Sequence, residues 1–102
     1  MVNFNPGRGS EQTGVRPALI IQNDIGNQYA STTVVAAITT TIKKYPVTVL
    51  LAQGKGGLKQ TSMVNLAQIL TIDKGRLIKK LGHVGDDKMK EIDEAIKVSL
   101  GI

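Results

Sequence analysis

The chain has 102 residues, a net charge of +5 and 41% hydrophobic residues, which fits one globular domain with a modest core. It contains no cysteine and one histidine, which excludes disulfides, thiolate chemistry and the usual zinc sites. Neither a membrane-spanning apolar run nor a signal-peptide pattern is present, so the sequence predicts a cytoplasmic protein. The basic excess points to an anionic partner, with nucleic acid one candidate.

The first half of the chain predicts strands separated by turns. "PALIIQN" (17–23) is a short apolar run typical of a buried strand, and "NDIGN" follows it as a tight turn. "STTVVAAITTTI" (31–42) is mostly β-branched, which favours a strand over a helix. "PVTVLLA" (46–52) starts at a proline and alternates, which indicates a third strand.

The second half changes from strands to helices. "QGKGGLKQ" is a basic, glycine-rich hairpin loop, and "TSMVNLAQILTI" (61–72) predicts two short strands or one bent strand. "DKGRLIKKLG" predicts a short helix capped by Asp73, with Leu77, Ile78 and Leu81 on one side. "DDKMKEIDEAIKVSLG" predicts a longer helix that ends at Gly101. This order gives a single domain over 1–102, mostly β with α, with a helix at the C-terminus.

Few enzyme classes are compatible with these residues. His83 stands alone between two predicted helices, so neither a metal cluster nor a serine triad is expected. "GKGGLK" has neither the spacing of a phosphate-binding P-loop nor its following Ser or Thr. The acidic residues of the C-terminal segment are typical of the exposed face of a helix.

The stretch "GRGSEQTGVRP" (7–17) allows two interpretations. Arg16 precedes a proline and is therefore held extended at the start of a strand, where its guanidinium can bind phosphate through two parallel hydrogen bonds. Glycine backbone N–H groups, Ser10 and Gln12 would add donors to the same anion. The alternative is an ordinary turn in which Arg16 pairs with Glu11. Residue chemistry alone favours the second interpretation.

Four motifs resemble the MazF/PemK toxins: "GSEQTGVRPALIIQN", "TVVAAIT", "QILTIDKGRL" and "VSLG". The resemblance covers nearly the whole chain, and the first motif is specific rather than compositional. It implies an SH3-like β-barrel of the CcdB/PemK type with a C-terminal helix, assembled as a homodimer. It also implies a ribosome-independent mRNA endoribonuclease that is neutralised by a cognate antitoxin with a disordered acidic tail.

The same resemblance assigns site residues. Arg16 in "VRP" and Thr39 at the end of "VAAIT" match the family's catalytic pair. It also suggests RNA contacts at Ser10, Gln12, Asn23, Ser62 and Gln68. Members cut single-stranded RNA without a metal or cofactor and leave a 2′,3′-cyclic phosphate and a 5′-hydroxyl. Because an arginine stays protonated at neutral pH, Arg16 is expected to stabilise the charged phosphorane rather than donate a proton.

Two departures from the family pattern bear on activity. Family chains usually carry more residues before the segment aligned with "NFNP", so most of the first barrel strand is expected to be absent here. Ala67 and Leu70 replace an acid and an arginine of the common motif. The alternative function is therefore a catalytically weak or inactive binding module on the same barrel, either an antitoxin binder or a CcdB-like topoisomerase inhibitor. Fold alone does not decide between the two functions.

Overall fold

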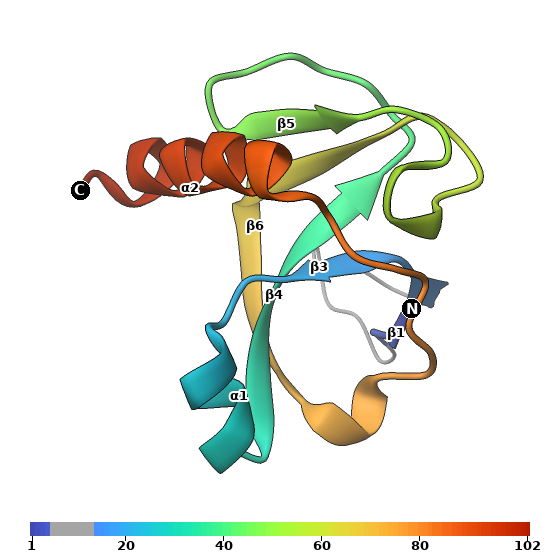
Figure 1. Ribbon diagram of the computed structural model, residues 1–102, viewed down its shortest axis with the longest axis vertical. Coiled ribbons are helices and arrows are strands. Elements are labelled where there is room, and N and C mark those ends of the chain that lie inside the picture. The colour runs from blue at the N-terminus through green and yellow to red at the C-terminus, as the bar shows by residue number, and fades with distance from the viewer. Residues whose placement is uncertain (5–13) are drawn as a thin grey trace.

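The computed structural model describes residues 1–4 and 14–102 (Figure 1). A curled antiparallel sheet has the strand order β3-β4-β6-β5, and β1 and β2 form a separate pair. The strands are β1 (Val2–Asn3), β2 (Val15–Arg16), β3 (Ala18–Ile20), β4 (Thr32–Thr39), β5 (Thr48–Leu51) and β6 (Ser62–Asp73); the helices are α1 (Asp24–Tyr29) and α2 (Asp86–Leu100). The prediction of a mostly β, barrel-like fold with a C-terminal helix is confirmed, with the sheet curled into a half-barrel. No helix in the described ranges is long and apolar enough to span a membrane.

The bend in β6 gives the sheet its curl. Ala36 of β4 lies opposite Ile69, whereas the next residue, Ala37, lies opposite Asn65. Residues 66–68 therefore form a bulge without partners on β4, and bulges bend a strand and increase its twist. The Leu66 amide donates to the Val47 carbonyl at 2.8 Å, which fixes the bulge against the segment before β5. Of the two predictions for 61–72, the single bent strand is confirmed.

The two faces of the sheet bury separate apolar clusters, because side chains alternate along each strand. One cluster lies between the sheet and α2 and contains Ala36, Ile38, Val49, Leu51, Leu58, Val64, Leu66, Ile92 and Ala95. The other packs β1 and Phe4 against the sheet and contains Val2, Phe4, Val35 and Ile72. Together they give a short chain two small cores instead of one.

Helix α2 lies across β5 and β6 (Figure 1). Asp86 and Asp87 occupy its first turn, where carboxylates interact favourably with the helix dipole, and its C-cap is Gly101, as predicted. Its contact face is narrow: Ile92 is fully buried and Ala95 is 4% exposed. The Ser99 hydroxyl donates to the Leu66 carbonyl at 2.6 Å, which ties the end of the helix to the β6 bulge.

Two local predictions were wrong. "NDIGN" belongs to α1 rather than to a turn, because the Asn23 side chain caps the helix by accepting from the Gly26 amide at 2.8 Å. The predicted helix after Asp73 is only a 3-10 turn (Lys74–Arg76), and 77–84 runs on without regular structure. Leu77 instead forms a bridge to Val2, so a contact distant in sequence replaces the local helix.

Candidate functional site

Arg16 lies where the main sheet and the β1-β2 pair separate. In the β3-β4 register Ala18 lies opposite Ala37 and Ile20 opposite Val35. Extending this register by two residues brings position 16 level with Thr39. Pro17, between residues 16 and 18, would lie opposite Ile38. Because proline has no N–H, it can form at most one of the two ladder hydrogen bonds available there. The strand therefore leaves β4 there, and Arg16 pairs with Val2 of β1, where it is exposed.

Thr39 is the last residue of β4 and is half-buried. Its hydroxyl oxygen accepts a hydrogen bond from the Thr41 amide at 3.1 Å. Because a hydroxyl can also donate, the Thr39 O–H remains able to donate to an anion while its oxygen is held in place. The site thus combines a fixed neutral donor with a guanidinium at the same end of the sheet.

The loop after Thr39 is fixed by contacts that the sequence did not suggest. Met63, directly opposite Thr39, is 4% exposed, and its sulfur accepts from the Lys43 amide at 3.4 Å. The Thr48 hydroxyl accepts from the Tyr45 amide at 3.0 Å and faces the Lys43 and Tyr45 carbonyls at 3.2 and 2.9 Å. Lysines in "IKKYP" are therefore carried by an ordered loop beside the catalytic candidates. The two lysines and the tyrosine of this motif are the sequence feature from which this loop could have been predicted as part of the site.

Charge is unevenly distributed over the molecule. The loops that follow β4 and β5 carry four exposed lysines: Lys43, Lys44, Lys55 and Lys59. Five of the eight acidic residues lie in α2: Asp86, Asp87, Glu91, Asp93 and Glu94. Since β6 starts between the ends of β4 and β5, both basic loops adjoin the end of the sheet that holds Thr39. A polyanion is attracted to that end rather than to α2.

Ser62 and Gln68 occupy different environments on β6. Ser62 adjoins Met63 but is 2% exposed, and its hydroxyl donates to the Gln60 carbonyl at 2.9 Å. Within one chain it stabilises the start of β6 rather than facing solvent. Gln68 is half-buried in the bulge, near the middle of the sheet.

Asn23 lies at the far end of the sheet from Thr39. The β3-β4 register places it level with Thr32, seven residues along β4, or at most about 23 Å at 3.3 Å per residue. Its side chain is exposed and caps α1. Ser10 and Gln12 lie outside the described residues. Within one chain Ser62 therefore adjoins the end of β4 that holds Thr39, whereas Asn23 lies at the opposite end of the sheet.

Leu70, where the family pattern has an arginine, belongs to the core. It lies opposite Val35 and packs against the cluster of Val2, Phe4, Val35 and Ile72. The apolar residue therefore fits its surroundings here. Within 1–4 and 14–102 no three His, Cys, Asp or Glu side chains are grouped so that they could hold a metal ion.

Residues 1–100 match the model of the PemK-like, MazF-like toxins of type II toxin–antitoxin systems. The chain belongs to this family. A relative named endoribonuclease MazF, from Staphylococcus saprophyticus, is 47% identical over 104 residues, which cover all of this MazF-like chain and 87% of the relative.

Solved structures agree with this membership. An endoribonuclease from a mycobacterial species, solved in complex with its cognate antitoxin, aligns with a TM-score of 0.83 and 27% identity, covering 99% of this chain and 88% of that one. The MazF of Deinococcus radiodurans aligns with a TM-score of 0.83 and 26% identity, covering 99% and 90%. This MazF-like chain thus shares the family's fold over its described length.

Proposed function

We propose that this protein is an endoribonuclease toxin that cleaves single-stranded RNA at short sequence motifs, independently of the ribosome. The observation that carries the proposal is the end of β4 that holds Thr39, which two lysine-bearing loops adjoin. Arg16 lies exposed two residues before Ala18, the first β3 residue paired with β4. Family membership and the name of the 47% identical relative support the same activity. We infer a cytoplasmic location, because messenger RNA is the proposed substrate.

The proposed reaction uses the RNA's own 2′-hydroxyl. Its oxygen attacks the adjacent phosphorus and loses a proton, the bond from phosphorus to the 5′-oxygen breaks, and that oxygen gains a proton. The products are a 2′,3′-cyclic phosphate and a 5′-hydroxyl, and no metal takes part. The RNA must be unpaired, because in-line attack requires the backbone to bend.

Arg16 and Thr39 have different parts in this reaction. Arg16 stabilises the charge that develops on the phosphorane, since a guanidinium binds two phosphate oxygens at once. Thr39 donates its hydroxyl hydrogen to the phosphate or orients the 2′-hydroxyl, because the Thr41 amide already fixes its oxygen. Catalysis then comes from positioning and electrostatics rather than from a strong general base.

The assembly we propose is a homodimer that binds a cognate antitoxin. A second copy would add its own Arg16 and Thr39, and its Asn23 would reach RNA that one chain cannot span. The mycobacterial neighbour was solved with its antitoxin, which supports an antitoxin partner here. An acidic antitoxin tail would be attracted to the exposed lysines around Thr39. Light scattering of the purified protein tests the dimer.

The decisive experiment incubates the protein with a long single-stranded RNA in EDTA and maps the new ends. We expect cuts at one short motif with cyclic phosphate termini. Arg16→Ala should lower the rate by about 10²–10³-fold, the range found when one transition-state donor is removed. Arg16→Lys should fall between, because a lysine keeps the charge but not the paired hydrogen bonds.

Two further variants complete the experiment. Thr39→Ala should lower the rate, whereas Thr40→Ala, an exposed neighbour in the same segment, should leave it unchanged. If the folded protein cuts no RNA yet binds an antitoxin, the binding-module alternative is correct. Cutting that stops in EDTA and returns with a divalent cation would refute the metal-free reaction.

A further inference from the structure

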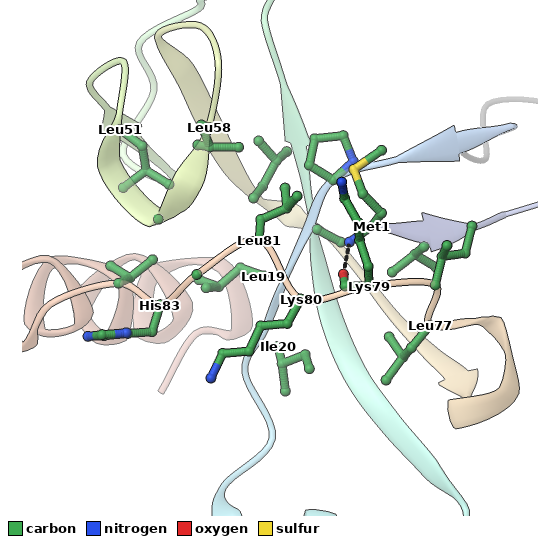
Figure 2. A pocket seen from close by; sticks show the side chains of 18 of the residues that line it. Met1, Leu19, Ile20, Leu51, Leu58, Leu77, Lys79, Lys80, Leu81 and His83 are labelled. Atoms are coloured by element: carbon green, nitrogen blue, oxygen red, sulfur yellow. Dashed lines mark hydrogen bonds between the residues drawn. The ribbon is translucent and has the colours of Figure 1, made fainter.

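Thr39 lies on the face of the sheet that points away from α2. Its neighbour Ile38 belongs to the apolar cluster that packs against α2, together with Leu51 and Leu58. Figure 2 shows these two leucines with Leu81, which packs against the same cluster. Because side chains alternate along a strand, Thr39 faces the opposite side of the sheet. An RNA phosphate held at Thr39 therefore brings its neighbouring bases to the face away from α2.

Asn65 is a polar side chain on this same face. Val64 and Leu66, on either side of it, belong to the cluster that packs against α2, so Asn65 faces away from that helix. It lies directly opposite Ala37 of β4, two residues from Thr39, which makes Asn65 and Thr39 diagonal neighbours across the two strands. Such neighbours are about 7–8 Å apart, a distance over which a base can extend from its own phosphate.

The side-chain amide of Asn65 is held with its N–H donors available. Its Oδ1 accepts a hydrogen bond from the Ala67 amide at 3.0 Å. Because only the oxygen of a side-chain amide can accept, this bond sets the orientation of the group. Among the described residues, none accepts a hydrogen bond from the Asn65 Nδ2, and the side chain is half-buried. Asn65 therefore suits a base with a carbonyl oxygen, uracil or guanine, rather than adenine or cytosine, which carry an amino group.

Tyr45 is an exposed aromatic residue close to Asn65. Thr48 lies directly opposite Asn65 and holds the backbone of Tyr45. The Thr48 amide donates to the Tyr45 carbonyl at 3.0 Å, and the Thr48 hydroxyl accepts from the Tyr45 amide at 3.0 Å. Tyr45 is nevertheless 58% exposed and follows Lys43 and Lys44 directly. An aromatic ring beside cations is the arrangement that binds unpaired nucleic acid, because bases stack on the ring while the cations attract phosphates.

We propose that Tyr45 and Asn65 form a subsite for one unpaired base, adjoining the phosphate held at Thr39. The proposal rests on the nuclease function above, because it takes RNA as the ligand. Tyr45 stacks on the face of the base, while Lys43 and Lys44 attract the phosphates on either side. Asn65 donates to the carbonyl oxygen of the base and so selects uracil or guanine. The subsite contributes to sequence preference, which phosphate contacts alone do not supply.

The first test measures the stacking on Tyr45. Fluorescein-labelled hexamers of 2′-deoxyuridine and of abasic sites carry the same phosphates, and without a 2′-hydroxyl they cannot be cut by the proposed reaction. We expect the uridine hexamer to bind about tenfold more tightly than the abasic one, by fluorescence anisotropy. Tyr45→Leu should remove this advantage and leave the abasic hexamer unaffected. The matched control is Tyr29→Leu, because Tyr29 is 80% exposed but belongs to α1, before β4 begins.

The second test measures how Asn65 reads the edge of the base. Asn65→Asp can still accept from the Ala67 amide, so the bulge is kept, but it offers no donor. The unaltered protein should prefer the uridine hexamer to a 2′-deoxycytidine hexamer about fivefold, the worth of one hydrogen bond. Asn65→Asp should reverse this order, because a carboxylate accepts from the amino group of cytosine. The added negative charge weakens both hexamers alike, so the ratio of the two affinities is the readout.

Three results would overturn the proposal. The first is equal or absent binding of the uridine and abasic hexamers, and the second is an affinity for uridine that Tyr45→Leu leaves unchanged. The third is a uridine-to-cytidine ratio that is the same in Asn65→Asp as in the unaltered protein. These tests are independent of cutting: a protein that binds the hexamers as expected but cuts no RNA would refute the nuclease proposal alone. RNA cutting at a motif that neither variant changes would refute the subsite alone.

Discussion

Replacing Gly57 with alanine tests whether the segment 77–84 is seated on the hairpin between β5 and β6. Gly57 has a φ of +78°, and a Cβ built there would lie 2.2 Å from the Leu81 carbonyl oxygen and 2.8 Å from its carbon. The left-handed backbone alone costs a non-glycine residue about 1–2 kcal/mol. Both atoms belong to the backbone, so the clash is relieved only if the segment moves off the hairpin. We expect a total loss of about 3 kcal/mol or more, since overpacking that forces a backbone shift adds about 1–3 kcal/mol.

Gly54 provides a matched control in the same hairpin. Its φ is +91°, but a Cβ there would meet nothing within 4 Å. Gly54→Ala should therefore lose only the backbone term, about 1–2 kcal/mol. In a domain of this size each kcal/mol lowers Tm by about 4–8 °C, so thermal and urea unfolding resolve the two variants easily. Equal losses would refute the reasoning, because they would mean that 77–84 does not rest on Gly57.

Three further predictions concern the helices and the N-terminus. Ser99→Ala should destabilise the protein by about 1–2 kcal/mol in urea unfolding, because the Leu66 carbonyl loses its donor at the bulge. Asn23→Ala should cost about 1 kcal/mol of stability as a lost N-cap, whereas Asn23→Asp keeps the cap and the stability. If Asn23→Asp stays stable but loses RNA binding, Asn23 contacts RNA in addition to capping α1. The folded pKa of the Met1 amine lies below the unfolded value of 8.0, so stability should fall as the pH drops from above 8.0 through the folded pKa. Lys79→Gln should move that pKa back toward 8.0 in an NMR titration and flatten the pH dependence.

Local chemistry was enough to predict the four strands of the main sheet and the last helix, but not the short strands β1 and β2. The β-branched run that forms β4 and the apolar spacing of α2 each favour one conformation, and the tertiary structure agrees with both. The segment 77–84 shows where such reasoning stops. Its apolar residues repeat as in a helix, but Val2, more than seventy residues away in sequence, pairs with Leu77 and holds the chain extended. No window of neighbouring residues contains that information.

The candidate site was predictable only in part. Arg16 could be selected from the sequence as an anion-binding residue, but Thr39 is one of several threonines in its strand and was assigned through the family resemblance. Thr39 lies two residues beyond the last pair between β3 and β4, a register that a single sequence does not reveal. Ser62 was predicted from the same resemblance, and its burial depends on how β6 begins beside β5.

Pro17 accounts for the exposed position of Arg16. With no N–H to donate, it ends the ladder between β3 and β4 one residue short of Arg16. The preceding strand is therefore available to pair with β1. Separation of the two strand pairs leaves Arg16 exposed on one side of the proline and the outer edge of β3 unpaired on the other. One residue without a donor thus leaves the arginine that we propose to bind phosphate exposed between the two strand pairs.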